Sequence, residues 1–320
     1  MCMTQRHKAS FAHHPSWTSY KTILAEDFAI TFPFEPEERW QTIRGHQIRY
    51  DIWEPQGSAK GTLILVHGGG GSGRVLAPAA LPALKAGWRV FAPDLPGYGL
   101  TIPAHGFRGE YAEWPLIIAD IAYAATGPVV FMGMSLGGLT AVFAAQKAGR
   151  VAGVIATTLV DPSDPATFDR VARWPWLGKL TRFAIRWMPG LVDRIPMPLA
   201  LATPLRAMTS GRRLQDYFVK DALLGGRWMR SRFFRLIHQH RLETNELGCP
   251  LLLIHPGADT WTPTAMSRPI FDRLETDKTL IELSNGTHLP LEQPAWTELC
   301  EGVGAFLDDR AQREVVPDAA

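Results

Sequence analysis

The chain has 320 residues, of which 46% are hydrophobic and 20% charged, and its formal net charge is +2. This composition is ordinary for a globular protein with a sizeable core, and the near balance of charge predicts no nucleic-acid partner. An apolar run over residues 129–145 is short for a bilayer span and changes from strand formers to helix formers, so we expect no transmembrane segment. Three widely spaced cysteines predict no disulfide framework and favour a reducing, cytoplasmic setting.

Residues 1–38 carry positive charge but contain no apolar stretch of signal-peptide length, so we expect a loose or surface-draped arm. From residue 39 onward, strand and helix patterns alternate. The expected strands cover residues 39–44, 47–53, 62–66, 89–92, 129–132, 151–156, 251–255 and 279–283. The expected helices cover residues 75–86, 111–125, 136–148 and 294–307. Apolar strands separated by helices predict an α/β fold with a mostly parallel eight-stranded sheet and helices on both faces.

The alternation of strands and helices breaks between residues 162 and 247, in a segment rich in Trp, Arg and Pro. Residues 162–245 contain 15 Lys and Arg against 6 Asp and Glu, so the rest of the chain is acidic. We predict a separately packed, mainly helical insertion over 162–247, a core over 39–161 and 248–310, and a tail over 311–320. Two interpretations of the insertion stay open: a functional surface, or solvated helix faces around a small core of its own.

A candidate nucleophile, Ser135, lies in the run Gly133-Met134-Ser135-Leu136-Gly137, between an expected strand and an expected helix. The glycines permit a tight turn that residues with a Cβ atom would resist. Such a turn pushes its serine out of the fold, towards whatever approaches the end of the sheet. The G-x-S-x-G run in this strand-turn-helix context is the nucleophile-elbow pattern.

Three other loops follow expected strands and carry matching chemistry. HGGGGSG at 67–73 has a bare backbone that can point N–H groups at a ligand oxygen, GADTWTP at 257–263 carries Asp259, and NGTHLPLEQP at 285–294 carries His288. Catalytic groups collect at the carboxyl ends of the strands in open α/β sheets. A serine hydroxyl becomes a good nucleophile when a neighbouring base accepts its proton, and histidine suits that role near neutral pH.

Over roughly residues 40–310, this ordered set of motifs resembles the α/β-hydrolase family. HGGGGSG is similar to the oxyanion loop of the family, PDLPGYG at 93–99 to its post-strand turn, and GMSLGG at 133–138 to its elbow. The resemblance implies that Ser135 is the nucleophile, that His288 is the base, and that Asp259 orients the imidazole and stabilises its cation. It also implies that the insertion over 162–247 is a cap above the active site.

The same resemblance implies an oxyanion hole. Backbone N–H groups of Leu136 and Gly69 would stabilise the tetrahedral intermediate, with Gly70 as the alternative second donor. Such donors are typically worth about 3–4 kcal/mol each, so the glycine loop would supply a substantial part of the rate.

Several other residues compete for these roles. Asp161 follows the expected strand at 151–156 and is a rival acid, although we expect it to cap the start of the insertion. His67 is a rival base, but its place before the glycine loop favours a structural role. His238 and His240 diverge by about 200° on a helix, and the pair His13 and His14 has no evident partner, so we predict no metal site and no cofactor.

The function that these motifs favour is hydrolysis of a carboxylic ester, as in a carboxylesterase or a lipase-like enzyme. Three alternatives use the same triad: a prolyl-iminopeptidase-type aminopeptidase, a C–C hydrolase and a lactonase. A fourth, of another class, is a non-catalytic ligand-binding protein on the same fold. We expect a small-molecule ester with an apolar acyl group as substrate, and an Arg-rich insertion that attracts negatively charged substrates or surfaces. The predicted pocket residues are Trp174, Trp176, Phe183, Trp187, Trp261 and Leu289.

Overall fold

The computed structural model describes residues 9–224 and 227–315, and eight of their strands form one sheet. The order across the sheet is β1-β2-β4-β3-β5-β6-β9-β10. Neighbouring strands are parallel from β4 to β10, whereas β1–β2 and β2–β4 are antiparallel. The strands span Glu37–Ile43 (β1), His46–Trp53 (β2), Thr62–Val66 (β3), Arg89–Pro93 (β4), Val129–Gly133 (β5), Gly153–Ala156 (β6), Leu251–His255 (β9) and Lys278–Glu282 (β10). This arrangement confirms the expected mostly parallel eight-stranded sheet.

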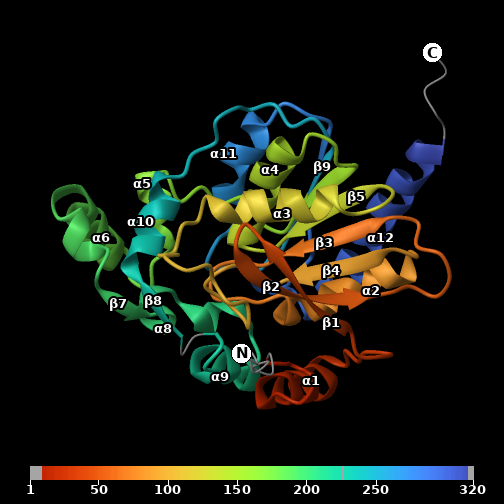
Figure 1. The fold of residues 1–320 in the computed structure, drawn as a ribbon, viewed down its shortest axis with the longest axis horizontal. Helices are drawn as coiled ribbons and strands as arrows, with labels where there is room; N and C mark the ends of the chain where they lie inside the picture. The colour runs from red at the N-terminus through yellow and green to blue at the C-terminus, as the bar shows by residue number, and fades with distance from the viewer. Residues whose placement is uncertain (1–8, 225–226, 316–320) are drawn as a thin grey trace, which may run out of the picture.

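Two pairs of helices cover the sheet (Figure 1). Helices α3 (Glu113–Tyr123) and α4 (Leu136–Ala148) pack together on one face, and α2 (Ala77–Lys85) and α12 (Ala295–Val315) pack together on the other. Every residue of β3, β5, β6 and β9 is buried as a result. Central strands covered on both faces read as continuous apolar runs, which is why the sequence located them well.

The described residues between β6 and β9 are mainly helical and project from one end of the sheet (Figure 1). They also include a small antiparallel pair of strands, β7 (Pro196–Pro198) and β8 (Trp228–Arg230). The helical elements are α5 (Pro165–Val171), α6 (Pro175–Trp187), α7 (Pro189–Val192), α8 (Leu199–Ala202), η2 (Leu205–Met208), α9 (Arg212–Lys220) and α10 (Ser231–Gln239). We call this region the cap. It follows β6 directly, so it starts at the edge of the sheet where the carboxyl ends of the parallel strands lie.

The N-terminal segment corrects one expectation. Residues Pro15–Phe28 form helix α1, which packs against α9 of the cap. Its buried side chains Trp17, Tyr20 and Leu24 recur at helical spacing, and the Tyr20 ring stacks on Tyr217 with centroids 5.2 Å apart. Of the two forms expected for residues 1–38, a loose arm does not fit the described part, whereas a segment draped over the surface does, because the apolar face of α1 is covered by Arg74 and Val75 of the core and by the cap. Residues 1–8 lie outside the described residues.

The C-terminal tail also differs from expectation. Helix α12 continues to Val315, so the first half of the predicted tail over 311–320 is helical. Residues 316–320 lie outside the described residues. The remaining helix, α11 (Thr264–Arg273), connects β9 to β10.

Candidate active site

Ser135 occupies a sharp turn between β5 and α4. Its backbone angles are φ 57° and ψ −131°, a conformation that side-chain-bearing residues rarely adopt. The turn is possible because the chain around it comes very close to itself. A Cβ atom on Gly133 would lie 2.0 Å from the carbonyl oxygen of Gly137, and one on Gly137 would lie 2.0 Å from that of Val66. The elbow thus requires glycine at both flanking positions and holds Ser135 at the end of the sheet.

Asp259 and His288 meet in the loops that follow β9 and β10. His288 Nδ1 lies 2.7 Å from Asp259 Oδ2, and both side chains are buried. The Thr262 hydroxyl donates to Asp259 Oδ2 at 2.7 Å, and the backbone N–H groups of Trp261 and Thr262 donate to Oδ1 at 2.9 Å each. Burial raises the pKa of Asp259, but His288 and these donors lower it by a larger amount. The pKa of Asp259 therefore lies below its ordinary value of 3.8. The carboxylate is therefore ionised at neutral pH.

This pairing leaves the other nitrogen of His288 available. His288 Nε2 is buried and has no hydrogen-bond partner within the described residues. With Nδ1–H donating to Asp259, Nε2 carries the lone pair and can accept a proton. Ser135 and His288 line the same hollow at the end of the sheet. Both groups line this hollow, although no hydrogen bond joins the Ser135 hydroxyl to Nε2 within the described residues.

Asp161 takes no part in this pair. Its Oδ1 accepts the backbone N–H of Ser163 at 2.8 Å, at the entrance to the cap. The cap of helix α5 is formed by Asp164, whose side chain accepts the backbone N–H of Thr167. The helix-capping role predicted for Asp161 therefore belongs to Asp164, three residues later, while Asp161 stabilises a local turn.

Three other histidines considered from the sequence are engaged elsewhere. His67 is fully buried, with Nδ1 hydrogen-bonded to the Gly68 carbonyl at 2.8 Å and Nε2 accepting the Leu95 N–H at 2.9 Å. Burial lowers the pKa of His67 to about 4, so the ring is a neutral spacer between two loops. His238 Nδ1 contacts the Pro162 carbonyl, and the His240 ring packs on Phe143. Among the described residues, no three His, Cys, Asp or Glu side chains are grouped to hold a metal ion.

Two backbone N–H groups suit an oxyanion hole. The glycine loop lies against the elbow, since a Cβ atom on Gly68 would lie 3.2 Å from the backbone nitrogen of Leu136. Leu136 begins helix α4, so its N–H has no partner within the helix. The Tyr98 hydroxyl, which lies close to the glycine loop, donates its proton to Met229 Sδ. Of the two glycines weighed as second donor, Gly69 lines both of the hollows that include Ser135, described below, whereas Gly70 lines only one of them.

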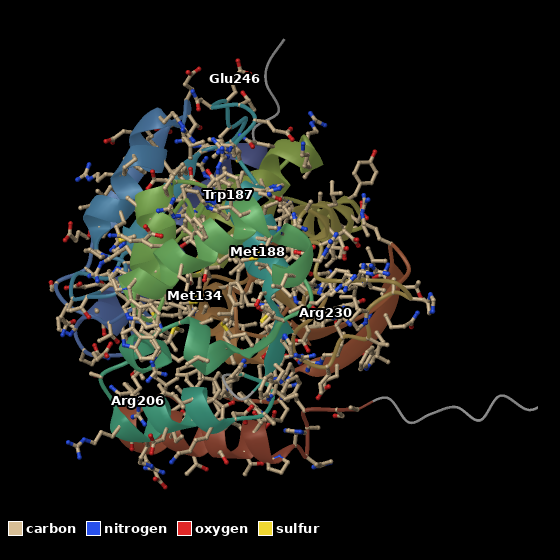
Figure 2. The ribbon with its side chains drawn as sticks, turned by 90° about the vertical axis from the view of Figure 1, so that its left-hand side faces the viewer. Met134, Trp187, Met188, Arg206, Arg230 and Glu246 are labelled. Carbon is tan, nitrogen blue, oxygen red and sulfur yellow. The ribbon has the colours of Figure 1, made fainter. Side chains whose placement is uncertain are left out.

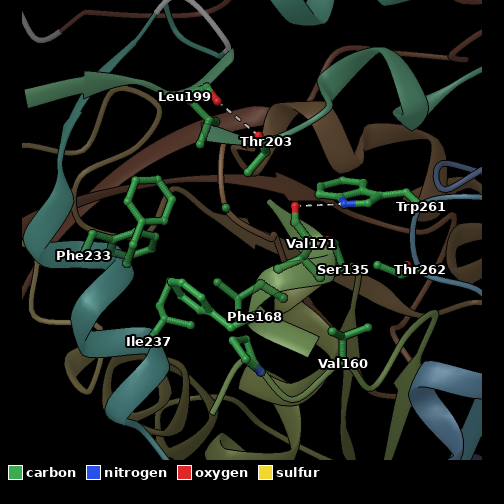
Figure 3. A pocket seen from close by; sticks show the side chains of 14 residues that line it. Ser135, Val160, Phe168, Val171, Leu199, Thr203, Phe233, Ile237, Trp261 and Thr262 are labelled. Carbon is green, nitrogen blue, oxygen red and sulfur yellow. Dashed lines mark hydrogen bonds between the residues drawn. The ribbon is translucent and has the colours of Figure 1, made fainter. Parts of the chain in front are cut away.

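An apolar pocket lies beneath the cap, over Ser135 (Figure 3). Its wall combines residues of the core loops with residues of the cap. Phe233 and Ile237 project into it from helix α10, and Trp261 closes another side, with its indole N–H donating to the Val171 carbonyl. The lining residues are Gly69, Ser135, Leu136, Val160, Pro162, Phe168, Val171, Leu199, Thr203, Phe233, Phe234, Ile237, Trp261 and Thr262.

A second hollow adjoins Ser135 and includes the glycine loop and His288. Leu289 lies here, together with Leu205, Met208 and Phe218 of the cap. Of the six predicted pocket residues, Trp261 thus lines the first hollow, which is the pocket beneath the cap, and Leu289 lines the second hollow. The serine stands where the two hollows meet, because both walls include Ser135 and Gly69.

The other four predicted pocket residues, Trp174, Trp176, Phe183 and Trp187, are exposed on the outside of the cap. Their assignment to the pocket is wrong. Helix α6 instead buries Gly178 and Ile185 on the face that meets the fold. Periodicity shows which side chains share a helix face, but it does not show which face points inward.

Sequence reasoning missed most of the cap residues that do line the pocket. Phe233 and Ile237 are four residues apart on α10, so the amphipathic spacing of SRFFRLIHQ was an available signal. Phe168 and Leu199 had no comparable signal, since each lies in a short element whose orientation depends on the packing of the whole cap.

Relatives with known activities match parts of the chain. A pimeloyl-(acyl-carrier protein) methyl ester esterase of Vibrio atlanticus is 27% identical over 222 residues, covering 65% of this chain and 80% of that protein. The esterase of the same description from Xanthomonas oryzae is 36% identical over 116 residues, or 35% of this chain. The chain spans only 40% of the length of that Xanthomonas protein.

Solved structures share the architecture. A soluble variant of monoglyceride lipase from Saccharomyces cerevisiae has a TM-score of 0.69 at 18% identity, covering 87% of this chain and 98% of that one. A monoacylglycerol lipase of Paleococcus ferrophilus has a TM-score of 0.60 at 23% identity, covering 82% and 99%. At these identities the likeness shows the fold alone. Within the described residues, no helix combines the length and the apolar character that crossing a membrane requires.

A family match covers most of the chain and agrees with the motifs and the geometry at the edge of the sheet. The sequence pattern of the alpha/beta hydrolase family matches residues 63–298, which include the glycine loop, the elbow and the loops that carry Asp259 and His288. This chain belongs to the alpha/beta hydrolase family.

Proposed function

We propose that this protein is a serine hydrolase that cleaves a carboxylic ester through a covalent intermediate on Ser135. The observation that carries the proposal is the buried His288–Asp259 pair, which leaves Nε2 as a proton acceptor at the hollow that Ser135 lines. A neutral imidazole held in this tautomer is what a serine nucleophile needs. The same geometry makes a purely ligand-binding role a poorer account, since binding alone does not require an oriented, buried acid-base pair.

The reaction follows from the positions of the groups. Ser135 Oγ attacks the ester carbonyl carbon while His288 Nε2 takes its proton, and the carbonyl oxygen gains the negative charge that the Leu136 and Gly69 N–H groups would stabilise. His288 then gives the proton to the alcohol oxygen as the C–O bond breaks. Water attacks the acyl-enzyme with His288 again as base, and the carboxylic acid leaves with Ser135 restored.

The two hollows support an assignment of the two halves of the substrate. The leaving alcohol must lie next to the group that protonates it, and His288 lines the second hollow. The acyl group then occupies the pocket beneath the cap, whose wall is formed largely by Phe168, Phe233, Ile237 and other apolar side chains. Burial there stabilises an acyl chain by about 0.8 kcal/mol per methylene.

Of the rival chemistries, the aminopeptidase fits the walls less well. An aminopeptidase substrate brings a positively charged amino group, which a buried site must pair with a negative charge. Neither hollow has an Asp or Glu side chain among its described lining residues. The relatives described as methyl ester esterases agree with an ester as the scissile group.

A panel of substrates tests this proposal. We expect p-nitrophenyl esters to be hydrolysed with kcat/KM that rises about fourfold per methylene until the pocket is filled, because fourfold corresponds to about 0.8 kcal/mol. Aminoacyl anilides should be cleaved at least a hundredfold more slowly. Faster cleavage of the anilides, or no turnover of any ester, would overturn the proposal.

A further inference from the structure

The cap carries an unusual concentration of exposed apolar side chains. Thirteen large hydrophobic side chains are exposed in the described part of the chain, and only Phe34, Ile102 and Tyr123 lie outside residues 174–228. The others are Trp174, Trp176, Leu180, Phe183, Trp187, Met188, Leu191, Ile195, Leu201 and Trp228. Figure 2 faces this side of the molecule, with Trp187 and Met188 at the front of the cap. An exposed apolar patch of this kind marks an interaction site more often than a scattered surface residue does.

Helix α6 organises the centre of this surface. At about 100° per residue, Trp176, Leu180, Phe183 and Trp187 fall within about 60° of one another around the helix axis. The side chains of Trp176, Phe183 and Trp187 are 60%, 59% and 65% exposed. The buried residues of α6, Gly178 and Ile185, lie on the opposite side. The aromatic stripe therefore points directly away from the fold.

The outward orientation of the stripe is fixed by contacts on the inner face of α6. A Cβ atom on Gly178 would lie 2.5 Å from the Cα atom of Asp169, so the helix approaches α5 as closely as glycine allows. Arg182 forms two hydrogen bonds to the Asp169 carboxylate, at 2.8 and 2.7 Å. Rotation of α6 to bury its aromatic residues would break both contacts.

Basic side chains line one flank of the stripe. Lys179 and Arg186 are exposed and lie on the flank of the stripe, within about 90° of its centre. Arg194 and Arg230 are exposed nearby on the cap, and none of these four has an ion pair within the described residues. The single acidic residue between positions 170 and 215 is Asp193, which is occupied by Arg232 and Arg235. The surface thus combines apolar side chains with uncompensated positive charge.

We propose that the cap face, defined here as Trp176, Leu180, Phe183 and Trp187 with Lys179 and Arg186, docks onto a phospholipid surface that carries anionic headgroups. Tryptophan and phenylalanine insert at the boundary between headgroups and acyl chains, while Lys and Arg attract the negative headgroups. A second copy of the chain is a poorer occupant. A two-fold contact through this face would place its basic residues against their own copies, with no acidic partner.

The interior of the cap adds a further reason. An apolar hollow beneath α6 is lined by Leu177, Gly178 and Thr181 of that helix. It shares Phe168, Val171, Thr203 and Phe234 with the wall of the pocket over Ser135. An apolar region therefore extends from under the docking helix towards the nucleophile. Docking would place this region beside a lipid layer.

Binding of the full-length protein to vesicles tests the proposal without relying on any esterase activity. We expect cosedimentation with vesicles of equal parts phosphatidylglycerol and phosphatidylcholine. The Trp176→Ala/Trp187→Ala double variant should partition onto these vesicles at least tenfold less, because it lacks two aromatic groups that would insert into the lipid layer. Lys179→Gln and Arg186→Gln should each reduce partitioning about fivefold, and vesicles of phosphatidylcholine alone should bind less of the wild-type protein.

Matched controls come from the core. Tyr123, which is 88% exposed on α3, and Arg268, which is exposed on α11, lie outside the cap. Tyr123→Ala and Arg268→Gln should leave vesicle binding unchanged, and unfolding midpoints should show that all variants fold. No binding of the wild-type protein, equal loss in the core controls, or binding indifferent to the aromatic substitutions would overturn the proposal. So would a dimer, found by sedimentation velocity without lipid, that the double variant dissociates.

Discussion

The catalytic edge of the sheet and the outer face of the cap are both rich in apolar residues, yet they are built in opposite ways. Around Ser135, backbone segments approach until only glycine fits, and His67, Asp259 and His288 are buried with defined partners. On α6 the large aromatic side chains face outward, and the separate cluster of buried residues in the cap is small. The residues around Ser135 are thus fixed by close contacts that leave no room for larger side chains. The exposed side chains of the cap can be replaced without disturbing those contacts.

The largest expected effect lies in the buried pair. Asp259→Asn should lower kcat/KM about 10⁴-fold, the magnitude given by the equivalent change in a serine protease, because asparagine favours the wrong tautomer of His288. Asp161→Asn should cost less than about tenfold, since Asp161 only stabilises a turn at the entrance to the cap. Steady-state kinetics on one p-nitrophenyl ester would measure both. A larger loss at Asp161 would reverse the assignment of the acid.

The next prediction probes the close backbone contacts of the catalytic edge. Gly137→Ala places a methyl group 2.0 Å from the Val66 carbonyl oxygen, so the elbow must shift. We expect a loss of about 1–3 kcal/mol in the free energy of unfolding, together with reduced activity. Gly304→Ala, in helix α12 with open space around the new methyl group, is the matched control and should be neutral or slightly stabilising. Urea denaturation measures both, and equal effects at the two sites would contradict the account of the elbow.

A third prediction separates the inner wall of the cap from its outer face. Ile237→Trp fills part of the pocket and should reduce kcat/KM for long-chain esters by about tenfold or more, while short esters are little affected. Trp187→Ala, on the outer face, should leave the chain-length preference for soluble esters unchanged. Kinetics over a series of chain lengths would compare the two. If Trp187→Ala shortened the preferred chain instead, the placement of the acyl pocket beneath α10 would be wrong.

The last prediction concerns the dependence of stability on pH. The pKa of His67 is lowered to about 4 in the folded protein, against 6.5 for a free side chain. Between these two values the unfolded chain binds more protons than the folded one, so stability falls as pH drops from 6.5 to 4 and His67 contributes no further loss below that. The contribution of His67 to this slope is at most about 1.4 kcal/mol per pH unit.

Two measurements check the pH prediction. The unfolding free energy of His67→Gln should depend less steeply on pH in this window than that of the wild-type protein. The second measurement does not need the variant to fold. NMR titration of the wild-type protein should show the His67 ring neutral down to about pH 5. A ring that titrates near 6.5 would contradict its assignment as a buried neutral spacer.

Much of the core could be predicted from the sequence, because a continuous apolar run such as Leu251–His255 is compatible with few environments. The positions of Ser135, Asp259 and His288, each in a loop that follows a strand, likewise predict that the three residues lie at one edge of the sheet. Helix α1 was missed because its apolar residues are spread among polar ones, and part of the surface that covers them belongs to α9, almost 200 residues later. The cap aromatics were misplaced because the inward face of α6 is marked by Gly178, a residue with no apolar signal of its own.

The most direct measurement of the central claim is covalent labelling of Ser135 by a fluorophosphonate, followed by intact-mass and peptide mass spectrometry. The probe reacts with a serine that a neighbouring base has activated. We predict one adduct per chain, on the peptide that contains Ser135, no adduct in Ser135→Ala, and much slower labelling in Asp259→Asn. An unmodified wild-type protein, or an adduct that persists in Ser135→Ala, would contradict the claim that Ser135 is the nucleophile.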